Sequence, residues 1–191
     1  GQVIAHYAKH HLPNYGVFDE FRYFVPGSEL CVVRVDGIDV AIVICEDLWQ
    51  DGGPVAMVRE AGAGLLVVIN GSPYERNKDD VRLALCARRA SEAGCTLAYV
   101  NMVGGQDELV FDGDSLVVDT SGTVVARAPQ FQQTVLITDL SLPLADVGRS
   151  AATVTVGAPV AGDQPSSGTV AARVSDDEEV WSALVLGLRD Y

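Results

Sequence analysis

Short apolar runs separated by turn residues fill the first 140 residues of the chain. The run Val40–Ile44 is rich in β-branched residues and is typical of a strand buried on both faces. A similar run, Leu30–Val35, precedes it, and Asp36-Gly37 between the two is the strongest short signal for a β-hairpin. The pattern therefore predicts two antiparallel strands over residues 30–35 and 38–44.

Helical and extended patterns alternate after this hairpin. Pro54 and Gly62 frame a predicted helix over residues 55–61, and apolar residues mixed with arginines predict a second helix over 79–93. Further strands are predicted over residues 3–8, 65–69, 96–102, 115–119, 123–128 and 134–139. Strands that first alternate with helices and then follow one another predict a mixed α/β sheet.

The composition changes after residue 140. Residues 141–174 consist mostly of Ala, Gly, Pro, Ser, Thr and Val without a persistent period, which predicts an interdomain linker. Ser175 then opens a capping box, and the apolar residues that follow fall on one helical face: Val180, Trp181, Leu184, Leu188 and Tyr191. Such a face needs a partner, so residues 175–191 are predicted to begin a further domain after a first domain of residues 1–140.

Charge and cysteine content limit the class of protein. A formal net charge of −13 over 191 residues argues against nucleic acid or an anionic membrane as a partner, because no basic patch could dominate that field. No apolar run is long enough to span a bilayer. The four cysteines show no C-x-x-C pairing and no signal peptide is visible, which favours reduced thiols in the cytoplasm. His6 and His10 lie on a predicted strand and loop rather than on a helix, so we expect no metal site.

Cys45 ends the predicted strand over residues 38–44. A thiol at the end of a buried strand would be held rigidly and remain reachable, as a catalytic nucleophile must be. The alternative is a small buried hydrophobe, which is the state of most free cysteines. Lys9, at the end of another predicted strand, favours catalysis, because a nearby ammonium lowers the pKa of a thiol and stabilises an oxyanion.

Several separated motifs resemble one family in their order and spacing. They are Tyr7–Glu20, Cys45–Trp49, Asn70–Tyr74 and Lys78. With these motifs, residues 2–140 resemble the nitrilase (carbon–nitrogen hydrolase) superfamily and, more narrowly, the glutaminase domain of bacterial glutamine-dependent NAD synthetases. Residues 179–191 resemble the stretch just before the ATP-binding loop of the synthetase domain. The resemblance implies a nitrilase-like α-β-β-α sandwich, incomplete at its N-terminal side.

The resemblance also implies a catalytic triad of Glu, Lys and Cys. Cys45 would attack the carboxamide of glutamine to form a thioester that water then hydrolyses. Lys9 and the backbone N–H of Glu46 would hold the oxyanion. The general base of the family is a glutamate upstream of the lysine motif, which is not among these residues. We therefore expect this chain alone to be inactive.

Four further residues match functional positions of the family. Glu20 matches a carboxylate that would orient Lys9 or the hydrolytic water. Tyr15, Ser72 and Lys78 match positions that contact the amino acid end of the substrate, where a lysine could pair with the α-carboxylate. The structural alternatives are an exposed loop acid for Glu20, and turn residues or a surface charge for the others. Two segments are expected to shape the pocket: Gly104–Glu108 and Phe111–Gly113.

The leading hypothesis is glutamine amide hydrolysis that supplies ammonia for ATP-dependent NAD synthesis from deamido-NAD. The resemblance implies ATP and magnesium for the synthetase domain, no cofactor in the present segment, and assembly into a homo-oligomer. Two alternatives remain: a free-standing amidase of the same superfamily acting on another small amide, and a non-catalytic interaction module on this scaffold. The predicted linker and capped helix argue against the first, and the presence of both Lys9 and Cys45 argues against the second.

Overall fold

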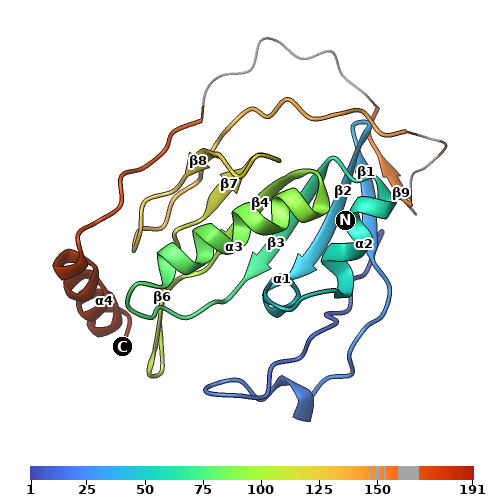
Figure 1. Ribbon diagram of the computed structural model, residues 1–191. Coiled ribbons are helices and arrows are strands. Elements are labelled where there is room, and N and C mark those ends of the chain that lie inside the picture. The colour runs from blue at the N-terminus through green and yellow to red at the C-terminus, as the bar shows by residue number, and fades with distance from the viewer. Residues whose placement is uncertain (147, 149–150, 153, 159–167) are drawn as a thin grey trace.

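The predicted hairpin forms as its turn residues dictate. The structure is a computed structural model that describes residues 1–191 except 147, 149–150, 153 and 159–167 (Figure 1). Strands β1 (Cys31–Val35) and β2 (Ile38–Ile44) pair antiparallel. Asp36 and Gly37 join them with φ angles of 47° and 85°, a conformation that Asp and Gly tolerate best.

A seven-stranded mixed sheet forms the centre of the structure, in the order β8-β7-β4-β3-β2-β1-β9. The strands beyond the hairpin are β3 (Leu65–Asn70), β4 (Thr96–Asn101), β7 (Leu116–Val118), β8 (Val124–Arg127) and β9 (Val154–Val156). Strands β2, β3 and β4 are parallel neighbours. The carboxyl ends of these three strands therefore meet at one edge of the sheet, where Cys45 follows β2.

Two predicted helices cover one face of this sheet. Helix α2 (Gly53–Ala61) connects β2 to β3 and ends at Gly62, and α3 (Lys78–Ala93) connects β3 to β4 and ends at Gly94 (Figure 1). Both terminal glycines adopt the left-handed conformation expected of a helix end. The buried residues between the helices and the sheet include Val43, Val58, Leu66, Leu85, Leu97 and Tyr99.

The other face of the central strands is apolar and less covered. Ile69 of β3 and Val100 of β4 are about half exposed, at 54% and 52%. The described residues thus contain one helical layer and one β layer, which is half of the expected α-β-β-α sandwich. The helices of the described residues are also all too short or too polar to cross a membrane.

Two predicted strands are wrong. Residues 3–8 run without a strand partner, because the free edge of β1 is occupied by β9. Residues 134–139 are extended but form no ladder. They lie over β4 and β7, where Thr134, Leu136 and Thr138 line a cavity of about 340 Å³.

Part of the predicted linker belongs to the sheet. Strand β9, at Val154–Val156, pairs parallel with β1, and the backbone N–H of Asp36 donates to the carbonyl of Val156 at 2.9 Å. The remainder of the 141–174 prediction falls partly on residues outside the described ones.

The chain also forms a second, two-stranded sheet outside the predicted strands. Strands β5 (Val103–Gln106) and β6 (Leu109–Asp112) form a hairpin with Asp107 at its tip. The segments expected to shape the pocket, Gly104–Glu108 and Phe111–Gly113, fall largely within this hairpin.

Helix α4 (Asp176–Asp190) begins as predicted, because the Ser175 hydroxyl accepts a hydrogen bond from the N–H of Glu178. Its inward face carries the buried residues Glu179, Ala183 and Leu186 and packs on the β5–β6 hairpin. The predicted apolar stripe faces outward instead, and Trp181 is 68% exposed.

Candidate active site

The predicted nucleophile lies in a strained turn between β2 and a short helix, α1 (Glu46–Trp49). Cys45 has φ 44° and ψ −96°, an uncommon conformation for a residue with a side chain. Its N–H donates to the carbonyl of Ile69 at 3.0 Å, and its carbonyl accepts from the N–H of Leu48 at 2.9 Å. Cys45 is partly exposed, whereas the other three cysteines are buried. This placement favours a reactive thiol over a core residue.

A cavity of about 260 Å³ opens beside Cys45. It is lined by Tyr15, Phe18, Cys45, Glu46, Trp49, Ser72, Glu75 and Lys78. The structure therefore brings the three predicted substrate-binding residues together around the thiol. Tyr15 comes from the loop after residue 10, whereas Ser72 and Lys78 come from the connection between β3 and α3.

Lys9 and Glu20 form an ion pair close to the cysteine. Lys9 Nζ lies 2.8 and 2.7 Å from the two carboxylate oxygens of Glu20, which is in a short 3-10 helix, η1 (Glu20–Arg22). Both residues line a second cavity of about 450 Å³, next to Ile44. The positive charge of Lys9 acts to lower the pKa of Cys45, so the structure places the predicted lysine within electrostatic reach of the thiol.

Burial outweighs Lys9 in setting the charge of the thiol. Burial raises the pKa of Cys45 above its ordinary value, with further contributions from the carboxylates of Glu46 and Glu20. The thiol is accordingly protonated at neutral pH, and a general base is needed to turn it into a nucleophile.

We expect the rate at which iodoacetamide alkylates Cys45 to reach half its maximum above pH 9.0, the ordinary thiol value. Only the thiolate reacts, and a raised pKa moves its formation to higher pH. Lys9→Met should move the midpoint higher still, because it removes the charge that lowers the pKa. Peptide mass spectrometry would follow the modification, and a midpoint below that of a free thiol would contradict this electrostatic description.

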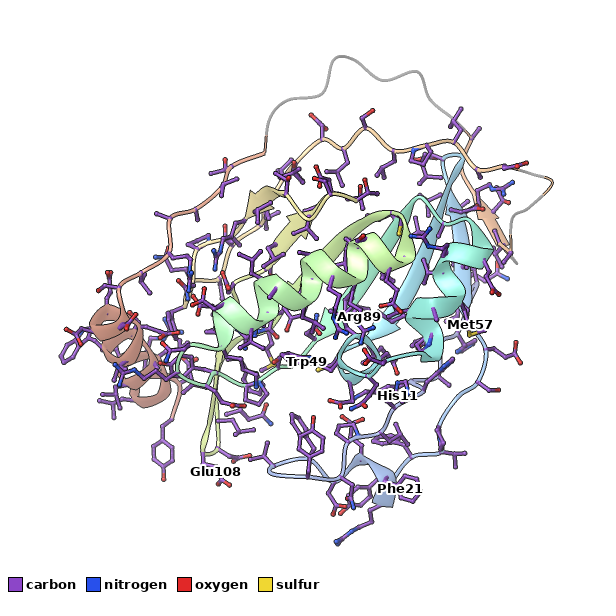
Figure 2. All side chains as sticks on the ribbon, in the orientation of Figure 1. His11, Phe21, Trp49, Met57, Arg89 and Glu108 are labelled. Atoms are coloured by element: carbon purple, nitrogen blue, oxygen red, sulfur yellow. The ribbon has the colours of Figure 1, made fainter. Side chains whose placement is uncertain are left out.

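The segment that carries Lys9 is fixed by Asp47, which the sequence analysis did not single out. Asp47 is fully buried, and its carboxylate accepts four hydrogen bonds. The donors are the Tyr7 hydroxyl (2.7 Å) and the N–H groups of His10 (3.0 Å), His11 (2.8 Å) and Ile44 (3.1 Å). Figure 2 shows His11 beside α1. One carboxylate thus joins the lysine segment to the cysteine turn.

Asp47→Asn is expected to lower the free energy of unfolding by about 2–4 kcal/mol. The substitution replaces one carboxylate oxygen by an NH₂ group, which cannot accept the two hydrogen bonds that this oxygen receives. Asp19→Asn is the matched control, since the Asp19 side chain is 42% exposed and pairs only with Arg22 among the described contacts. We expect it to change stability by less than about 0.5 kcal/mol. Urea unfolding measures both variants, and equal stabilities would show that Asp47 is not an anchor.

Glu46 and Asp47 both belong to the first turn of α1. The Glu46 carboxylate accepts from the Tyr15 hydroxyl at 2.7 Å and from Gln50 Nε2 at 2.6 Å. The Glu46 side chain therefore orients Tyr15 in the cavity, while its predicted role concerns the backbone N–H.

Lys78 and Ser72 each have partners on the protein. Lys78 Nζ lies 2.5 Å from Glu75 Oε1 and 6.0 Å from the centre of the Trp49 ring. The N–H of Ser72 donates to Asn101 Oδ1 at 2.9 Å, and the Ser72 carbonyl accepts from Arg82 at 3.1 Å. Ser72 is thus part of a rigid loop, and the cavity presents a paired positive and negative charge.

Two buried arginines of α3 hold the loops around the cavity. Arg82 donates to the Ser72 and Pro73 carbonyls and lies 2.5 Å from Asp112, and it is fully buried. Arg89 donates to the carbonyls of the α1 region at 2.6–3.1 Å: Leu48, Trp49 and Gln50. Figure 2 shows Arg89 between α3 and α1, near Trp49. Their i, i+7 spacing on the helix is the sequence signal that could have identified them.

Neither histidine of the rejected metal pattern is in a ligand cluster. The His10 ring stacks on Tyr7 at 5.6 Å. Within the part of the chain that the structure describes, there is no group of three or more His, Cys, Asp or Glu residues suited to a metal ion.

Known proteins resemble this chain along its whole length. A family model described as carbon-nitrogen hydrolase matches residues 1–149. Glutamine-dependent NAD(+) synthetase of Xanthomonas campestris is 45% identical over 198 residues, which cover all of this chain and 32% of that protein. The Aquifex aeolicus protein of the same name is 39% identical over 204 residues, which cover all of this chain and 36% of that protein. The chain thus spans about a third of the length of these relatives.

Solved structures show the same fold. Glutamine-dependent NAD+ synthetase from Acinetobacter baumannii superposes with a TM-score of 0.79 at 33% identity, over all of this chain and 32% of that one. An amidase from Nesterenkonia sp. AN1, of the nitrilase superfamily, gives a TM-score of 0.57 at 33% identity, over 67% of this chain and 47% of that one. The nitrilase-like fold class predicted from sequence is confirmed.

Proposed function

The chain belongs to the carbon–nitrogen hydrolase family, and we propose that it carries the glutamine-hydrolysing site of a glutamine-dependent NAD synthetase. The observation that carries this proposal is the placement of Cys45. The thiol lies in a strained turn between the Lys9–Glu20 ion pair and the cavity lined by Tyr15, Ser72 and Lys78. Full-length relatives of this name at 39–45% identity support the choice of glutamine as substrate.

A related structure supports a covalent role for the cysteine. In a glutamate-to-glutamine variant of the Nesterenkonia amidase, the acetamide moiety of fluoroacetamide is attached at the active-site cysteine. We propose that Cys45 corresponds to a cysteine of this kind, because it ends a central parallel strand and borders a cavity.

The proposed reaction proceeds in two steps. The Cys45 thiolate attacks the amide carbon of glutamine, and the carbonyl oxygen becomes an oxyanion that Lys9 Nζ and the backbone N–H of Glu46 stabilise. The C–N bond then breaks, the nitrogen takes up a proton and leaves as ammonia, and a thioester remains. Water attacks the thioester, which releases glutamate and restores the thiol. Glu20 orients the Lys9 ammonium through its two contacts.

The amino acid end of glutamine is a zwitterion, and the cavity offers a partner for each charge. We assign the α-carboxylate to Lys78 and the α-ammonium to Glu75, which pair with each other in the structure. Tyr15 and Ser72 supply hydroxyl groups beside them.

The proton of Cys45 requires a base that we place outside these residues. The carboxylates that line the two cavities are already hydrogen-bonded: Glu20 to Lys9, Glu46 to Tyr15, and Glu75 to Lys78. We therefore propose an upstream glutamate as the general base. In the whole protein, ATP, magnesium and deamido-NAD are the further ligands of this proposal. A cytoplasmic location and assembly into a homo-oligomer remain predictions.

The proposal is tested by measuring ammonia release from glutamine, asparagine and simple amides. We expect the protein as its gene encodes it to hydrolyse glutamine, and the 191-residue chain produced alone to release no more ammonia than its Cys45→Ala variant. Preference for another small amide would favour the free-standing amidase. Absence of turnover in the whole protein would favour a non-catalytic module, and turnover by the chain alone would show that it contains its own base.

A further inference from the structure

Helix α4 packs beside one wall of the Cys45 cavity. Its inward residues Ala183 and Leu186 form a small apolar cluster with Phe131 and Tyr74, whose rings lie 5.5 Å apart. Tyr74 begins a segment, residues 74–80, that we call the pocket corner. This corner carries both Glu75 and Lys78 of the cavity and the first turn of α3. Helix α4 therefore contacts the pocket corner at Tyr74, and the corner carries the proposed substrate-binding charges.

Arg173, just before α4, holds the first turn of α3. Its guanidinium donates from Nε to Asp79 at 2.7 Å and from a second nitrogen to Asp80 at 2.6 Å. Asp79 is buried, and the two carboxylates are adjacent in sequence, so each would repel the other without a shared cation. The contact joins residues more than ninety positions apart at the point where the pocket corner becomes helix.

Glu179, on the buried face of α4, also lies next to the pocket corner. Only 4% of this residue is exposed, and one carboxylate oxygen has no hydrogen-bond partner. Burial and Asp79 raise the pKa of Glu179, whereas the backbone N–H of Asn77 acts to lower it. Asn77 is the N-cap of α3, has φ 62°, and makes no side-chain cap hydrogen bond. The Glu179 carboxylate thus lies beside the N-cap of α3.

Close backbone contacts fix α4 at this distance from the corner. The N–H of Gly105 donates to Asp190 Oδ2 at 2.8 Å. A Cβ at Gly105 would lie 3.2 Å from the Cα of Gly187, and a Cβ at Gly187 would lie 3.1 Å from a methyl group of Val110. Larger residues at either glycine would push α4 away from the hairpin.

We propose that Arg173 and Glu179 are positioning residues that hold the pocket corner, and with it Lys78 and Glu75, in the arrangement that binds substrate. The cavity itself is lined by other residues, so both act through the first turn of α3. A function for α4 follows: the proposed amidase site is complete only when this helix is docked. The identity of the substrate in this inference rests on the proposed function, whereas the contacts of Arg173 and Glu179 do not.

The test compares Arg173→Ala and Glu179→Ala with Leu188→Ala, which shortens an outward side chain of α4 that is 81% exposed. The protein is used as its gene encodes it. Peptide-resolved hydrogen exchange measures the pocket corner directly, and we expect exchange of residues 74–80 to accelerate about fivefold or more in the two test variants and not in the control. The KM for glutamine should rise about tenfold with kcat within about twofold, as expected when binding alone is lost.

Two further variants keep the test independent of misfolding. Glu179→Gln retains an acceptor for the Asn77 N–H and should restore most of the wild-type KM and exchange. Gly187→Leu, which leaves the corner itself unchanged, should reproduce the faster exchange by displacing α4. Unchanged exchange in all test variants, or faster exchange with unchanged KM, would overturn the proposal. If glutamine is not hydrolysed at all, the proposed function fails, while the exchange result still decides whether Arg173 and Glu179 hold the corner.

Discussion

Cys45→Ala is expected to reduce glutamine-driven ammonia release by the whole protein about 10⁴-fold or more, since loss of a catalytic nucleophile removes the covalent route entirely. NAD synthesis supplied with free ammonia should remain within about twofold of wild type. The thiol lies in a turn anchored by Ile69 and Leu48 backbone groups, which alanine preserves. Coupled assays of glutamate and NAD formation from each nitrogen source measure both activities.

Cys31→Ala is the matched control for this substitution. Cys31 is a buried cysteine on β1 and does not line the Cys45 cavity. We expect it to cost some stability and to leave the ratio of glutamine-driven to ammonia-driven synthesis unchanged. Equal loss of both activities in Cys45→Ala would mean that the cysteine is structural, as the alternative interpretation of the sequence holds.

Local signals were sufficient for most of the sheet and for three helices. Asp36-Gly37 specifies its own turn through two positive φ angles, Gly94 ends α3 in the left-handed conformation, and Ser175 caps α4. Each of these features depends on residues within a few positions of one another, which is why pattern alone finds them.

Strand pairing was less predictable, because it depends on which edge is free. Residues 3–8 include a short apolar run typical of a strand, yet β9 pairs with the edge of β1 instead. That partner comes from the predicted linker, far along the chain. Val154–Val156 is β-branched throughout, but so short a run does not indicate which sheet edge it pairs with. The apolar stripe of α4 was predicted to pack on a partner but is exposed, for a similar reason. The glycines at 105 and 187 allow the other face of the helix to approach the hairpin.

The candidate site also contains residues that the sequence predicts and residues that only the structure reveals. The resemblance supplied Cys45, Lys9 and Glu20, and the structure places them near one another. The residues that fix them were missed, because a buried Asp47 or Arg89 is recognisable only with its distant partners in place. Asp47 accepts a hydrogen bond from Tyr7, which is 40 residues away in the sequence. Among the described hydrogen bonds of Arg89, only the one to Glu92 stays within its own helix. Buried charges need such partners, and sequence periodicity does not name them.

The charge of Lys9 should matter mainly in the transition state. Lys9→Met keeps most of the side-chain volume but removes the ammonium, and we expect kcat for glutamine hydrolysis to fall about 10³-fold, the cost of losing one oxyanion donor. Glu20→Gln should cost less, about 10–100-fold, because Glu20 acts by orienting Lys9 through its two short contacts. The double variant should be hardly worse than Lys9→Met alone, since residues that act as a unit are not additive.

Comparing Lys78→Met with Lys9→Met distinguishes a lysine that binds substrate from one that stabilises the transition state. Lys78 is also a cation at the cavity, paired with Glu75, but we assign it to the unreacting end of the substrate. Its loss should raise KM and leave kcat nearly unchanged, because that contact is equally strong in the ground state and the transition state. Steady-state kinetics of these variants would measure the split. A Lys9→Met variant that changes only KM would place Lys9 with the substrate-binding residues and leave the Glu46 N–H as the remaining proposed oxyanion donor.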